Sequence, residues 1–189
     1  MFTSVRQNSN HLEHGDLVAG DKHETHHHYS VGENKELTRL YEQFKIERTE
    51  AAECSGFSDK LQHYFTAATD SEIRSLDIKL KESGRDDLIF FAKMLKETAA
   101  KQIMQHQTSA SAQRIYTIIL DELHTNYMLS VIPQIQADAS RAEIDHAINR
   151  IIDKVRDMLG ENMLELTAKD LLGFIFFLGG NCHIRWDKC

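Results

Sequence analysis

Histidine is concentrated at the start of the chain. Residues 1–34 hold six of the eleven histidines of the 189-residue sequence, and His23, His26 and His28 lie close to Asp21. Imidazole and carboxylate groups ligate zinc and other borderline metals. If this stretch is extended, His26 and His28 lie on one face, because side chains alternate along a strand. A second ligand pair at the usual spacing is missing, so the alternative is a polar, partly exposed arm.

A second group of possible metal ligands ends the chain. Cys182 and His183 are adjacent, and Cys189 is the last residue. Neighbouring residues are awkward ligands for a single ion, and no matching cysteine pair lies upstream. Packing is the alternative interpretation, because free cysteine is commonly buried. The three cysteines do not form a disulfide framework, and nothing at the start resembles a signal peptide, so we expect a cytoplasmic protein.

The sequence contains no motif that indicates an enzyme. A hydrolase nucleophile elbow, a phosphate-binding loop and a dinucleotide fingerprint are all missing, and the carboxylates fall on the polar faces of amphipathic helices. The net charge of −7 argues against a general nucleic-acid binder. We therefore expect a non-catalytic protein without a cofactor.

The C-terminal segment is the most apolar part of the chain. Phe174 and Phe177 lie in a run that leads to Ile184, Arg185 and Trp186, the only tryptophan. Chain ends are usually polar, so this end must pack against its own core or against a partner. The apolar run is about half as long as the ~20 residues that a membrane span needs. An adjacent tryptophan and arginine are typical of interface anchors, and the alternative is that Trp186 completes the core.

The elements that position these residues are predicted to be helices. The chain has one proline and 41% hydrophobic residues, and apolar positions recur at helical spacing from Asn34 onward. Capping boxes are expected at Thr69–Glu72, Ser140–Glu143 and Thr167–Asp170, and Gly160 is expected to end a helix. The prediction is an all-α multi-helix bundle.

Residues 1–34 are predicted to form a separate arm of short, β-like strands. A Gly-Asp step occurs twice at a spacing of five, and the apolar residues between the steps favour strands. The residues concerned are Gly15, Asp16, Val18, Gly20 and Asp21. A lone pair of strands is marginally stable, so we expect the arm to need the helical body or other copies of itself. Residues 35–104 are then a helical region, and the polar stretch Gln105–Ala112 is a candidate boundary before a domain at 105–189.

The last part of the chain resembles a known family. The Asp121–Tyr127 segment, the helix over Ser140–Ile152 and, above all, Leu172–Leu178 followed by Gly180–Trp186 are similar to C-terminal domains of ABC-three-component systems. These are Lamassu-like bacterial anti-phage systems with an SMC-like ABC ATPase, a middle component and an effector. The effector usually carries a nuclease or other toxic domain, and no domain of that size precedes residue 105.

The resemblance implies an adaptor or oligomerisation subunit with protein partners. Phe174, Phe177, Ile184, Arg185 and Trp186 would bind the ATPase, the middle component or an effector, or would lock the fold that does. The arm would join copies of the chain, with no membrane contact and with nucleic acid reached only through partners. Two alternatives remain open: a metal-binding protein or enzyme that uses the His23–His28 cluster, and an antitoxin-like inhibitor of a toxic partner.

Overall fold

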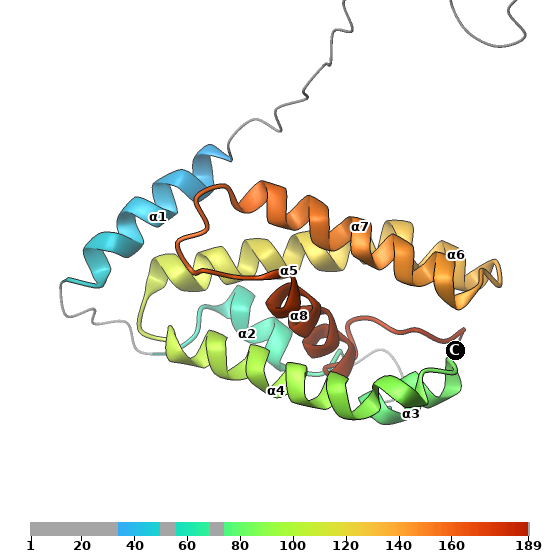
Figure 1. The fold of residues 1–189 in the computed structure, drawn as a ribbon. Helices are drawn as coiled ribbons and strands as arrows, with labels where there is room; N and C mark the ends of the chain where they lie inside the picture. Colours follow the sequence, from blue (N-terminus) through green and yellow to red (C-terminus); the bar gives the residue numbers. More distant parts are fainter. Residues whose placement is uncertain (1–33, 50–55, 69–73, 189) are drawn as a thin grey trace, which may run out of the picture. The chain divides into compact units, whose positions relative to one another are not determined.

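The regular structure of this protein is helical wherever it is described. The computed structural model describes residues 34–49, 56–68 and 74–188, and within them every regular element is a helix (Figure 1). The all-α prediction is thus confirmed for these residues. The predicted N-terminal arm, with Gly15–Asp21 and the His23–His28 cluster, lies outside them.

The described residues contain eight α-helices and one 3-10 turn. In chain order they are α1 (Lys35–Glu47), α2 (Asp59–Phe65), α3 (Leu76–Glu82), the 3-10 turn η1 (Asp86–Leu88), α4 (Ile89–Gln105), α5 (Ala110–Ser130), α6 (Ile132–Gln136), α7 (Arg141–Leu159) and α8 (Ala168–Gly180).

Local signals place the ends of the later helices as the sequence predicts. Ser140 and Glu143 form a reciprocal capping box at the start of α7, and Thr167 and Asp170 form another at the start of α8. Gly160 ends α7 with a φ of 56°, a left-handed conformation that glycine adopts without a steric penalty. These three predictions are confirmed.

The predicted start of the third helix is wrong. We expected a capping box at Thr69–Glu72, which lies outside the described residues, but α3 begins only at Leu76. Ser75 is its N-cap, and the Ser75 hydroxyl accepts a hydrogen bond from the Ile78 amide at 3.3 Å. Thr69–Glu72 and Ser75 both precede the apolar residues of α3, so the local sequence pattern does not decide which of them caps the helix.

The polar stretch at 105–112 contains the turn between α4 and α5, residues 106–109. Ser109 caps α5, and the carboxylate of Glu47 on α1 accepts hydrogen bonds from the hydroxyls of Ser109 at 2.5 Å and Ser111 at 2.8 Å. A carboxylate at a helix N-terminus is favoured by the exposed amides and the helix dipole. Glu47 therefore holds the start of α5 against α1.

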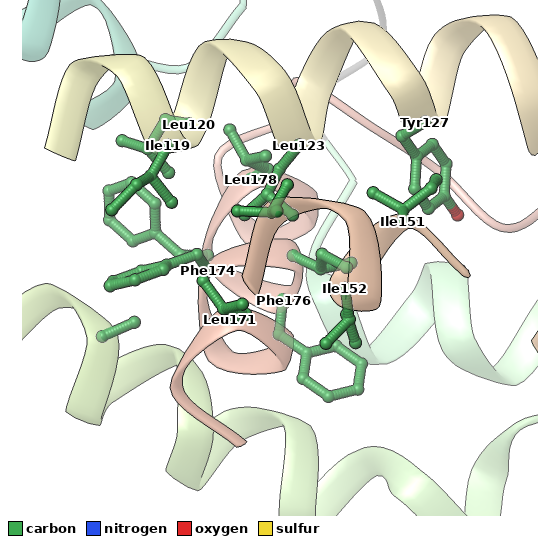
Figure 2. Packing of buried hydrophobic residues seen from close by; sticks show 14 of the residues in the cluster. Ile119, Leu120, Leu123, Tyr127, Ile151, Ile152, Leu171, Phe174, Phe176 and Leu178 are labelled. Atoms are coloured by element: carbon green, nitrogen blue, oxygen red, sulfur yellow. The ribbon is translucent and has the colours of Figure 1, made fainter. Parts of the chain in front are cut away.

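Helix α8 lies at the centre of the core. It contacts α3, α4, α5 and α7, and its apolar residues are buried on nearly all sides. Figure 2 shows Leu171, Phe174 and Leu178 of α8 lying among side chains of α5 and α7. Those side chains are Ile119, Leu120 and Leu123 of α5 and Ile151 and Ile152 of α7. Of the two alternatives for the apolar C-terminal segment, packing against the protein's own core is confirmed for α8.

Candidate docking site at the C-terminal tail

The chain turns back sharply after α8 into a segment that we call the tail, residues 181–188. The turn is closed by hydrogen bonds from the His183 amide to the Leu178 carbonyl at 2.9 Å and from the Cys182 amide to the Gly179 carbonyl at 3.3 Å. Cys182 has a φ of 64°, which reverses the chain direction. The tail therefore runs back along the end of the helix instead of leaving the protein.

A buried lysine joins the tail to α3 and α8. Lys79 is 3% exposed, and its ammonium donates hydrogen bonds to the carbonyls of Gly179 at 2.8 Å and Ile184 at 3.5 Å. The carbonyl end of a helix carries partial negative charge, which favours a cation there. Lys79 could not be identified from the sequence, because one lysine on a short helix carries no pattern that distinguishes it.

Trp186 forms part of the protein's own core. It is 3% exposed, and its ring centroid lies 5.7 Å from that of Phe176 and 6.0 Å from that of Tyr127. Gly179 leaves room for the indole: a Cβ placed there would lie 2.4 Å from the Trp186 ring. Of the two interpretations of Trp186, the one in which it completes the core is confirmed.

A tyrosine on α5 holds the backbone of the tail. The Tyr127 hydroxyl donates a hydrogen bond to the Arg185 carbonyl at 2.9 Å, and its side chain is fully buried. Burial raises the pKa of Tyr127 well above its ordinary value, so the phenol stays neutral and keeps its proton for this bond.

Removing this hydroxyl is expected to loosen the tail. Tyr127→Phe should lower the free energy of unfolding by about 1 kcal/mol, because one buried hydrogen bond is lost. Urea denaturation followed by circular dichroism measures the loss, and Trp186 fluorescence should shift to longer wavelength. Tyr41→Phe is the matched control, because Tyr41 donates an equivalent bond to the Leu159 carbonyl at 2.9 Å, remote from the tail. Tyr41→Phe should cost similar stability and leave the fluorescence unchanged; a shift in both variants would contradict the assignment.

Ion pairs fix the last residues of the tail. Asp187, with a side chain only 5% exposed, pairs with Arg74, which also pairs with Glu82. Lys188 pairs with Asp138 after α6. The cost of dehydrating the buried Asp187–Arg74 pair offsets much of its attraction. This pair therefore determines where the tail lies more than how stable the protein is.

A hollow of about 450 Å³ lies beside the tail. It is lined by residues of α3, α6, α7 and the tail, including Trp186 at its edge. Its rim is charged and accessible: the side chains of Arg141 and Lys188 are 42% and 50% exposed, and Asp138 is 81% exposed. The buried guanidinium of Arg85 at the same hollow pairs with Asp145 at 2.7 Å.

The structure brings only part of the predicted site together. Ile184, Arg185 and Trp186 lie in the tail, and of these only Arg185 is even partly exposed. Phe174 and Phe177 are buried in α8, where Phe174 packs against Tyr116 at 5.8 Å and Phe177 against Phe65 at 5.0 Å between ring centroids. These residues were predicted either to bind a partner directly or to lock the fold that does. Burial of their side chains supports the second role.

Of the three possible metal ligands at the C-terminus, Cys182 and His183 are described, and Cys189 lies outside the described residues. The Cys182 thiol donates to the Arg74 carbonyl at 3.6 Å, and His183 packs among aromatic rings. Within the described ranges, no group of three or more histidine, cysteine, aspartate or glutamate side chains is placed to hold an ion. The arm residues Gly15, Asp16, Val18, Gly20 and Asp21, and the candidate ligands His23, His26 and His28, lie outside those ranges.

Comparison with known families decides the class of this chain. Residues 75–186 match C-terminal domain 9 of the ABC-three-component systems, which is more than half of the sequence. The chain belongs to this family. Domain 9 begins here at Ser75, the N-cap of α3, and ends at Trp186, so it includes Lys79, α8 and nearly all of the tail. The resemblance seen at 105–189 is confirmed, and domain 9 also includes α3 and α4.

Membership makes the chain a component of an ABC-three-component defence system, and a multicomponent system implies protein partners. Searches of curated proteins and of solved structures give no match. Among the residues that the structure describes, no helix is both long and apolar enough to cross a membrane.

Proposed function

We propose that this protein is a non-catalytic adaptor of an ABC-three-component system, and that it docks an effector or the ATPase through the surface around its tail. The observation that carries the proposal is that the tail is fixed from several sides while a charged rim beside it stays exposed. Lys79, Tyr127 and Arg74 hold the tail from three different segments. The accessible rim consists of Asp138, Arg141 and Lys188.

A fixed, charged surface suits reversible docking. Side chains and backbone that are already ordered lose little conformational entropy on binding, so more of the interaction energy remains as affinity. Exposed charges around an apolar centre steer the encounter and select the partner. The buried aromatic residues of α8 act indirectly in this arrangement, because they hold the tail in place.

Charge reversal on the rim tests the docking surface. We expect Arg141→Glu to weaken binding to the effector or the ATPase of the same ABC-three-component system by about tenfold, since rim charges govern complementarity. Arg156→Glu is the matched control: Arg156 is 54% exposed on the same helix, about 22 Å further along it, and this variant should bind within about twofold of wild type. Binding is measured by surface plasmon resonance on purified components. Equal binding by both variants would contradict the docking surface.

We also infer that the N-terminal arm joins copies of this protein. The support is the repeated Gly-Asp step and the small size of the arm, because unpaired strand edges are templates for association. Size-exclusion chromatography with light scattering compares the full chain with residues 35–189, which lie within one compact unit. The full chain should be an oligomer and the shortened chain a monomer; monomers in both cases would show that the arm has no such role.

A further inference from the structure

Three histidines from distant parts of the sequence meet at the start of the tail. His63 lies on α2, His124 on α5 and His183 in the tail. The ring centroid of His183 lies 5.1 Å from that of His63 and 6.2 Å from that of His124. The tail also contacts the backbone of α2 here, because the side-chain amide of Asn181 donates a hydrogen bond to the Tyr64 carbonyl at 2.8 Å.

The ring of His183 lies beside two backbone acceptors, the carbonyls of Tyr64 and Thr66. Its Nε2 atom is buried and has no hydrogen-bond partner within the described residues. Tyr64 packs edge-on against it with ring centroids 5.1 Å apart. One carboxylate faces the group, that of Asp121 on α5, and it already accepts a hydrogen bond from the Tyr64 hydroxyl at 2.6 Å. The titratable groups facing His183 are therefore Tyr64, Asp121 and the two other histidines.

These surroundings favour neutral rings. Partial burial, followed by the charges of His63 and His124, lowers the pKa of His183, and hydrogen bonds to the carbonyls of Tyr64 and Thr66 oppose this shift. Partial burial also lowers the pKa of His124, with His63 adding to the effect and a hydrogen bond to the His183 carbonyl and the charge of Asp121 opposing it. Burial and hydrogen bonding to Asp121 raise the pKa of Tyr64, so this phenol is uncharged and does not balance an imidazolium.

We propose that His63, His124 and His183 form a proton-sensitive clasp that holds the tail at neutral pH and releases it in acid. When the rings are neutral, they pack on one another and on Tyr64. Protonation places like charges about 5–6 Å apart and leaves on His183 a charged ring with a buried nitrogen that has no hydrogen-bond partner within the described residues. Movement of the tail into water separates the rings and hydrates them.

The sign of the pH dependence follows from linkage. In the open state His124 and His183 regain the ordinary histidine pKa of about 6.5, so the open state binds more protons than the closed state. The contribution of the clasp to stability is therefore present above pH ~6.5 and is lost as the pH falls below it. This behaviour requires no docking partner, so it can be tested separately from the adaptor role.

The single tryptophan makes release directly measurable. Trp186 lies three residues after His183, and it is the only tryptophan of the chain. Its emission should report tail opening in the free full-length protein, titrated from pH 8 to 5 with EDTA present to remove metals. We expect a shift to longer wavelength between pH 6.5 and 5 at constant far-UV circular dichroism, because histidine titrates there while the helices stay folded.

Substitution of the histidines identifies the groups responsible. His183→Gln should abolish the fluorescence transition or lower its midpoint by about one pH unit, since the central proton acceptor is removed. His63→Gln provides a second test that is mild for folding, because His63 is exposed, and it should lower the midpoint in the same direction. His146→Gln is the matched control: His146 is exposed on α7, outside the cluster, and should titrate like wild type.

Three results would overturn the proposal. The first is a wild-type protein whose fluorescence does not change between pH 8 and 5. The second is a fluorescence transition that coincides with loss of helix, which would indicate global acid unfolding. The third is an unchanged midpoint in both His183→Gln and His63→Gln.

Discussion

Replacing Trp186 with alanine is expected to lower the free energy of unfolding by about 3–5 kcal/mol. The indole is 3% exposed and fills the space between Phe176, Tyr127 and Gly179. Its removal takes away a large apolar surface and leaves a cavity at the point where the tail meets the core. Because domains are stable by only about 5–15 kcal/mol, this is a large fraction of the total.

Urea denaturation followed by far-UV circular dichroism measures this loss, since the variant has no tryptophan to report by fluorescence. Phe90→Ala is the matched control: Phe90 is also a large aromatic residue, but it is 83% exposed on α4, so its loss should change stability by no more than about 0.5 kcal/mol. Equal losses in the two variants would show that Trp186 does not support the core.

The variants Trp186→Ala in the tail and Arg141→Glu on the rim separate stability from docking. Trp186→Ala should reduce partner binding together with stability, because it displaces the tail. Arg141→Glu should reduce binding alone, since its exposed pair with Asp87 contributes only about 0–1 kcal/mol. A Trp186→Ala protein that binds its partner at full affinity would place the docking surface elsewhere on the molecule.

Much of the fold could be predicted because its signals are local. The capping boxes at Ser140 and Thr167 and the terminal glycine at Gly160 each act within one helical turn, and all three are found where expected. The apolar run of α8 likewise predicts burial from composition alone. The start of α3 could not be predicted in the same way, because Ser75 competes with an earlier serine-containing stretch for the same apolar face.

The candidate site could be located from the sequence but not built from it. An apolar run followed by the single tryptophan indicates a buried segment, and Trp186 of the tail is buried. The groups that anchor the tail come from elsewhere: Lys79 from α3 and Tyr127 from α5. Likewise, His63, His124 and His183 are separated by about 60 residues at each step, and no periodicity links them. Only the packing of the helices brings such residues together.

Gly179→Ala is expected to lower the free energy of unfolding by about 1–2 kcal/mol. In most helices the same substitution raises the free energy of unfolding, because alanine has the higher helix propensity. A Cβ at Gly179 would lie 2.4 Å from Cζ3 and 2.6 Å from Cη2 of the Trp186 ring. The ring is rigid and is packed against Phe176 and Tyr127, so it can move only if the tail moves. Overpacking of this kind costs about 1–3 kcal/mol, which exceeds the ~1 kcal/mol that alanine gains over glycine in a helix.

The neighbouring glycine provides the matched control for this prediction. A Cβ at Gly180 would meet Lys96 at 2.5–2.6 Å, but those atoms are the far end of a flexible side chain that can swing away. Gly180→Ala should therefore leave stability unchanged or raise it by up to about 0.5 kcal/mol. Urea denaturation compares the two variants, and Trp186 emission should shift to longer wavelength only for Gly179→Ala. A loss of stability in Gly179→Ala alone would show that the close contact with Trp186 matters. Equal changes in stability for the two variants would mean that the tail moves aside at no cost in stability.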